Sequence, residues 1–227
     1  MHISSPERFV DYVRASLPDA IALPAEFVAA LEWMDDNDCV FPSAKGDGRR
    51  YATLYPRLLP GRGMSCISIH AVDPEDAVHW LGKGVAGAER LAPFIRTGYD
   101  GSCAALWRDP QDRLRLVHLD SGSGSTWAGV ITDDPVTMLR FLAIGYPEPC
   151  APEMFALTPL EAYEEDDFSD EAPFMPPTQF QQWVSRTFNV GIPTHAQDLI
   201  PTTPDMDAAN PTDPFLLWLK SAQDQAA

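Results

Sequence analysis

The stretch of residues 94–146 constrains the fold most, because short turns separate its apolar segments. Cys103–Arg108 and residues 113–119 have the composition of β-strands. The four residues between them, Asp109-Pro110-Gln111-Asp112, are typical of a tight turn, which joins antiparallel neighbours. A further strand is expected at residues 127–131. Strands joined in this way predict an antiparallel meander.

A helix is expected directly after the meander. Asp133 or Asp134 can cap it, Pro135 occupies its first position and Gly145 ends it. Strands followed by a helix that packs on them are typical of the α+β class. We therefore predict an α+β protein with a mostly antiparallel sheet of about five or six strands and helices packed on it.

The region before the meander predicts helices and then strands. One helix is expected to start at Ser4 or Ser5, and a second helix is expected to start at Leu23-Pro24, because apolar residues follow at helical spacing. Alternating apolar residues then predict strands at 51–55 and 65–70.

The net charge restricts the classes of partner. The 227 residues include 33 Asp and Glu against 16 Lys and Arg, a net charge of −17. Binding to nucleic acid or to anionic lipid is not expected, because both need clustered Lys and Arg. A protein with a basic surface is the natural complement, and solubility alone is the alternative explanation. No run of 18 apolar residues predicts a membrane span.

Most of the negative charge lies after residue 150. Residues 151–227 hold 13 acidic residues against Arg186 and Lys220, a net charge of −11. We predict one α+β domain at 1–150 and an acidic, Pro-rich C-terminal extension at 151–227. Its short helices are expected to fold back on the main domain, because their apolar side chains would otherwise face water.

Two acidic clusters are candidates for contact with a basic partner. One cluster lies at the end of the second expected helix. Negative charge there opposes the helix dipole, so these acids need another explanation, which is either solvation or contact with a partner. The other is the run at 161–171, expected to be a solvated loop, with a flexible acidic lid as the alternative. The candidate contact residues are Asp35, Asp36, Asp38, Glu164, Glu165, Asp166, Asp167, Asp170 and Glu171.

Motifs for catalysis or metal binding are missing from the sequence. The Gly/Ser loop at 121–125 lacks the spacing of a phosphate loop and of a Gly-x-Ser-x-Gly elbow. His118-x-Asp120 offers two ligands where a metal site needs three or four. The four cysteines are far apart, and the first residues lack the pattern of a signal peptide. We expect reduced thiols, a cytoplasmic location, no catalytic residues, no metal and no cofactor.

A small polar turn, a strand, a hairpin and a closing helix are expected within residues 94–107, 115–124 and 131–148. Further upstream, Leu23-Pro24 precedes an opening helix. This pattern resembles the SUKH superfamily. The tail, with its segments 180–188, 192–193 and 213–218, is similar to an extension found in some bacterial members. The resemblance implies an α+β fold without catalytic residues. Bacterial members are mostly immunity proteins that block a toxin of a contact-dependent or type VI-like system, and fungal relatives regulate cell-wall synthesis.

The leading hypothesis is therefore a non-enzymatic immunity protein that binds a cognate toxin and occludes its active site. For a nuclease toxin, the acidic side chains would mimic the phosphates that its basic groove binds. The alternative is a regulatory or scaffolding protein-interaction module without a toxin partner. A third hypothesis, a hydrolase, requires a pocket with converging polar groups.

Overall fold

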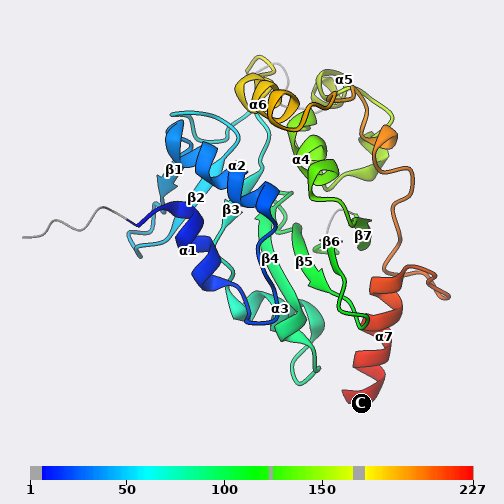
Figure 1. The fold of residues 1–227 in the computed structure, drawn as a ribbon. Coiled ribbons are helices and arrows are strands. Elements are labelled where there is room, and N and C mark those ends of the chain that lie inside the picture. Colours follow the sequence, from blue (N-terminus) through cyan, green and yellow to red (C-terminus); the bar gives the residue numbers. More distant parts are fainter. Residues whose placement is uncertain (1–6, 123–124, 166–171, 227) are drawn as a thin grey trace, which may run out of the picture.

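A computed structural model describes residues 7–122, 125–165 and 172–226. Its seven strands form one antiparallel sheet whose order follows the chain, as Figure 1 shows. The α+β class and the antiparallel sheet are confirmed, whereas the expected number of five or six strands is too low. The strands are β1 (Val40–Pro42), β2 (Arg50–Thr53), β3 (Ser68–His70), β4 (Leu91–Arg96), β5 (Cys103–Arg108), β6 (Leu114–Leu119) and β7 (Gly129–Thr132).

The two strands that the sequence did not predict, β1 and β4, both contain proline. Pro93 lies inside β4, where a missing N–H normally argues against a central strand. The sheet accommodates it at a bulge, because the register of β4 on β5 shifts between Pro93 and Ile95. Strand β1 has three residues and ends in Pro42 at the sheet edge. A short edge strand that ends in proline resists pairing with another chain.

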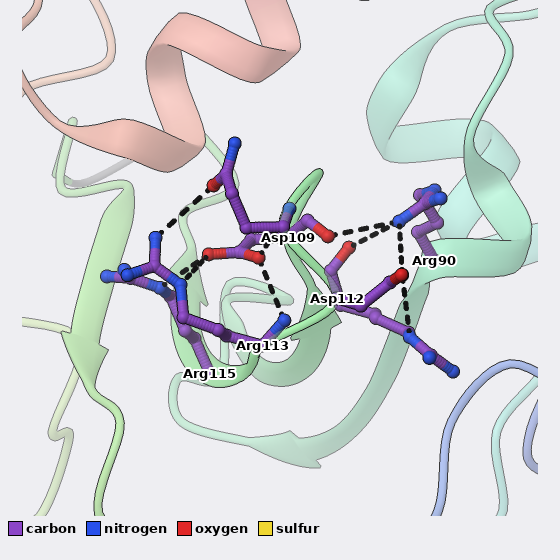
Figure 2. A network of polar contacts seen from close by, with 7 residues as sticks. Arg90, Asp109, Asp112, Arg113 and Arg115 are labelled. Carbon is purple, nitrogen blue, oxygen red and sulfur yellow. Dashed lines mark hydrogen bonds and ion pairs between the residues drawn. The ribbon is translucent and has the colours of Figure 1, made fainter.

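A buried carboxylate closes the β5–β6 hairpin (Figure 2). The Asp109 side chain accepts hydrogen bonds from two backbone N–H groups of the turn, each at 2.9 Å. It also accepts from Nε of Arg113 at 2.8 Å and Nε of Arg115 at 3.1 Å. Burial opposes ionisation of Asp109, but these hydrogen bonds hold its pKa below the ordinary value. The network therefore stabilises the hairpin that the sequence predicts.

Helices cover both faces of the sheet (Figure 1). One face packs against four helices and the short helix α5, and the other face packs against two. On the first face lie α1 (Phe9–Ser16), α2 (Ala25–Asp36), α4 (Pro135–Ile144), α5 (Pro159–Glu164) and α6 (Thr178–Phe188), and on the second α3 (Pro74–Leu81) and α7 (Pro214–Ala226). The described residues also form the short 3-10 helices η1 (Ala88–Arg90), η2 (Pro152–Met154) and η4 (Ala196–Asp198).

Helix boundaries follow local capping. The Asp134 carboxylate accepts hydrogen bonds from the N–H groups of Val136 and Thr137, and Gly145 ends α4 in the left-handed conformation, as the sequence predicts. The backbone of Arg8 is extended, and helix α1 begins at Phe9. The helix start expected at Ser4 or Ser5 is therefore wrong. Ser4 and Ser5 themselves lie outside the described residues.

The second face of the sheet depends on helix α7. Trp107 of β5 is fully buried there. The Phe215 ring meets the Trp107 ring edge-on at 5.2 Å, and the Trp218 ring lies 5.4 Å from it. Gly87 allows this approach, since its φ is +108° and a Cβ atom there would lie 2.7 Å from Trp218. Residues far apart in the sequence therefore share one core.

Phe215→Ala should lower the free energy of unfolding by about 3 to 5 kcal/mol, because it removes the ring that covers Trp107 and leaves a cavity. Leu217→Ala on the same helix is the matched control, since Leu217 is 51% exposed. Its substitution should change the free energy of unfolding by less than about 1 kcal/mol. Urea unfolding followed by tryptophan fluorescence measures both. Equal effects of the two substitutions would contradict the packing of α7 on the sheet.

Candidate functional site

Asp35 and Asp36 at the end of α2 bind the start of α1. The Asp35 carboxylate accepts a hydrogen bond from the backbone N–H of Phe9 at 2.8 Å. The Arg8 guanidinium lies 3.5 Å from Asp35 and 3.0 Å from Asp36. The first N–H groups of a helix carry partial positive charge, so α1 offsets the unfavourable acids at the end of α2. These two carboxylates therefore have a structural role.

Asp38 also has an internal partner. Its carboxylate lies 2.8 Å from both Nε and Nη2 of Arg57. Both side chains are exposed, so this ion pair contributes little to stability. All three candidate aspartates of the first cluster thus contact arginines of the chain itself.

The second acidic cluster lies elsewhere. Glu164 ends α5, so the start of the run expected as a loop is helical, and Thr158 and Glu161 form its capping box. Glu164 and Glu165 are exposed, and neither forms an ion pair with another described residue. Figure 1 shows α5 apart from α2, with α4 and α6 between them. The remaining candidates, Asp166, Asp167, Asp170 and Glu171, lie outside the described residues.

Ion pairing differs between the two parts of the chain. Among the described residues, every ion pair joins two side chains from the first 150 residues. The described carboxylates after residue 150 are mostly exposed, and those of Glu161 and Asp213 cap helices. Among the described residues, the carboxylates of this part of the chain are therefore not balanced by ion pairs.

A cavity of about 620 Å³ lies between α3 and strands β3 to β6. Cross-strand pairing brings its sheet residues together, because Ser68 of β3 pairs with Arg96 of β4, and Arg96 pairs with Cys103 of β5. His70 follows on the same face of β3, two residues after Ser68. Strands β3, β4 and β5 thus place a guanidinium, an imidazole and a thiol along one wall.

His70 is the most constrained polar group of this wall. Its Nε2 atom lies 2.7 Å from Ser68 Oγ. Burial and the positive charges of Arg96 and Arg49 lower the pKa of His70 to about 4, so the ring is neutral at pH 7. In the described part of the chain no carboxylate hydrogen-bonds to Nδ1, so the Ser68–His70 pair lacks the third group that orients a catalytic histidine.

The Cys103 thiol lines the cavity without the properties of a nucleophile. Burial and the negative charge of Asp76 raise its pKa to about 12. The thiolate, which is the reactive form, is then scarce at neutral pH. Cys103, Cys39, Cys66 and Cys150 are all free thiols.

His118, which the sequence places two residues before Asp120, is fully buried in the core. Its Nε2 lies 2.9 Å from Thr97 Oγ1, and its Nδ1 lies 2.8 Å from the carbonyl oxygen of Trp127. Its ring stacks on the Trp127 ring at 3.9 Å. Both nitrogens are occupied, so His118 is not available to a metal. The described residues contain no group of three or more metal-ligating side chains.

The sequence did not reveal the cavity, because its residues come from separate strands. Arg96 and Cys103 become neighbours only when the bulge at Pro93 sets the register of β4 on β5. The alternation Ser68-x-His70 was the one available signal, since residues two apart on a strand share a face.

These features define a protein of the α+β class in which helices cover both faces of an antiparallel sheet. Comparison of the chain with protein-family models, curated proteins and solved structures finds no match. In the part of the chain that the structure describes, no helix combines the length and the apolar character needed to cross a membrane.

Stability should fall in mild acid because His118 is buried in its neutral form. Burial lowers the pKa of His118 to about 4, whereas the unfolded chain takes up this proton near pH 6.5. The unfolded state therefore binds more protons between pH 4 and 6.5, and the native state loses stability as the pH falls through this range. From pH 7 to pH 5 the loss from this residue is about 2 kcal/mol.

His118→Gln should remove that part of the pH dependence while keeping groups that hydrogen-bond. His79→Gln is the comparison, because His79 is exposed and its substitution leaves both buried histidines, His70 and His118, intact. Urea unfolding at pH 7 and pH 5 measures the difference for each variant. An unchanged pH dependence in His118→Gln would show that the ring is not held neutral.

Proposed function

We propose that the chain is a non-enzymatic immunity protein that binds a cognate toxin through a basic surface of that toxin and occludes its active site. The observation that carries this proposal is the net charge of −11 after residue 150, where the described carboxylates form no ion pairs. Opposite charges on two proteins speed their association and favour the correct partner. The resemblance to the SUKH superfamily points to the same class of function.

The structure changes which acids the proposal favours as contacts. Asp35, Asp36 and Asp38 bind arginines of the chain itself, so a partner would have to compete for them. Glu164 and Glu165 are exposed and form no ion pair among the described residues. A partner can approach these two without breaking an internal contact. The end of α5 is therefore the part of the surface that we propose meets the toxin first.

For a nuclease toxin, the mechanism follows from charge. A groove that binds nucleic acid carries Lys and Arg at the spacing of phosphates. Exposed carboxylates that enter such a groove replace the phosphates and exclude the substrate. The association would weaken as salt rises, because salt screens exposed charges.

The test is co-expression of the chain with the product of the neighbouring reading frame. We expect the two to co-purify, and cells that produce that product to survive only when the chain is present. A neighbouring product that is toxic but does not bind the chain would contradict the proposal. A neighbour that binds without being toxic would favour a regulatory or scaffolding module instead.

Charge reversal tests the contact surface. Glu164→Lys with Glu165→Lys should weaken binding of the co-purified partner by roughly tenfold or more, because two attractive contacts become repulsive. Glu32→Lys with Glu89→Lys changes the net charge equally at exposed acids of the first 150 residues. This control should weaken binding by less than about threefold, mainly through the association rate. Equal losses in both variants would show that only net charge matters and that the end of α5 is not the contact surface.

A further inference from the structure

We propose that the cavity between α3 and strands β3 to β6 binds a small zwitterion, a free amino acid or dipeptide, with its carboxylate at Arg96 and its ammonium group at Asp76. This site is independent of the toxin contact, since it involves none of the acids proposed for the partner. Its volume of about 620 Å³ lies within the range of pockets that hold small organic ligands.

Arg96 provides the anion-binding end. Its side chain lines the cavity and is exposed. Among the described residues it forms no hydrogen bond and no ion pair, unlike the two other arginines of the wall. Arg49 pairs with Asp73 at 3.2 Å, and Arg50 pairs with Glu7 at 3.7 Å. A guanidinium matches a carboxylate through two parallel hydrogen bonds, so the unpaired Arg96 suits that group best.

Asp76 provides the cation-binding end. It lies in the first turn of α3 and lines the same cavity. Its carboxylate forms no ion pair among the described residues, whereas the neighbouring Asp73 caps α3 and binds Arg49. Asp76 is exposed at the mouth of the cavity; partial burial and the nearby Asp73 raise its pKa, while the positive charges of Arg49 and Arg96 oppose that rise. An ammonium group would supply the ion-pair partner that Asp76 lacks among the described residues.

The two unpaired charges explain why a ligand with both signs fits better than an ion of one sign. Arg96 and Asp76 form no ion pair with each other, although the positive charge of Arg96 acts to lower the pKa of Asp76. An anion without an ammonium group would bind Arg96 but face Asp73 and Asp76. A cation would face Arg96, Arg49 and Arg50 in turn. A zwitterion satisfies both ends, and its zero net charge avoids repulsion by a chain of net charge −17.

The other residues that line the cavity determine which side chain on the ligand would fit. Val72, Pro93, Trp80 and Leu119 line the cavity with apolar surface. The neutral His70 ring lines the same cavity, with its Nε2 atom in contact with Ser68 Oγ. An apolar or aromatic side chain on the ligand would bury surface here, so amino acids such as leucine and phenylalanine should bind more tightly than glycine.

Isothermal titration of the full chain with free leucine, phenylalanine, glycine and the dipeptide of two leucines tests the site. We expect leucine, phenylalanine or the dipeptide to bind. The N-acetylated and C-amidated forms of the tightest ligand should bind at least about tenfold more weakly, because each lacks one charge. The preference between free amino acids and the dipeptide identifies the source of the zwitterion.

Two substitutions assign the two ends. Arg96→Gln and Asp76→Asn should each weaken binding by about tenfold or more. Lys83→Gln and Glu75→Gln are matched controls, because both side chains are exposed and neither lines the cavity. Both controls should bind as the unmodified chain does. Circular dichroism checks that each variant folds.

Three outcomes would overturn the proposal. The first is no binding of any of the four ligands up to about 10 mM, a range that would reveal even weak association. The second is equal binding of a blocked form, which would mean that one of the two charges is not recognised. The third is undiminished binding in Arg96→Gln or Asp76→Asn. None of these outcomes bears on the toxin contact, which is tested with a different ligand and different residues.

Discussion

The burial of Trp107 is the interaction on which the rest of the structure depends. A sheet that is apolar on both faces must be covered on both, and the second face is covered by α3 and by α7 from the end of the chain. Phe215 and Trp218 exclude water from Trp107, while Phe180 of α6 joins the core on the opposite face. Residues after 150 therefore contribute to both cores. The described acids of this part lie next to these packed apolar residues and are mostly exposed themselves.

The acidic residues of the chain fall into two groups with different physical roles. Carboxylates of the first 150 residues often compensate a local charge, as Asp35 does at the start of α1 and Asp109 does within its hairpin. The described carboxylates after residue 150 form no ion pairs, so their field extends into solvent. The net charge of the chain does not distinguish these two groups. A carboxylate that is paired and hydrogen-bonded contributes the same charge of −1 as a carboxylate that is free. A carboxylate without an internal partner can bind a second protein without lowering the folding stability of the chain, whereas a paired carboxylate must first give up its contact.

Local chemistry in the sequence predicted the elements that depend on neighbouring residues. The β5–β6 hairpin, the Asp134 cap and the end of α4 at Gly145 all follow from residues a few positions apart. Strand β4 was missed because Pro93 contradicts a central strand until a bulge absorbs it. The roles of Asp35 and Asp36 were missed because their partner, the start of α1, lies 26 residues away from Asp35 in the sequence. The cavity is the extreme case, since it exists only after four strands and a helix have assembled.

Binding at the acidic surface depends on long-range charge interactions, whereas binding in the cavity depends on short-range contacts. This difference explains how the two sites can coexist. A basic partner responds to the long-range field of the whole chain, which salt screens over about 10 Å. A zwitterion has no net charge, so the long-range field has little effect on its approach, and short-range contacts with Arg96 and Asp76 decide its binding. Salt should therefore weaken the first association more than the second. Because the cavity lies beneath α3 while Glu164 and Glu165 end α5, neither ligand needs to displace the other.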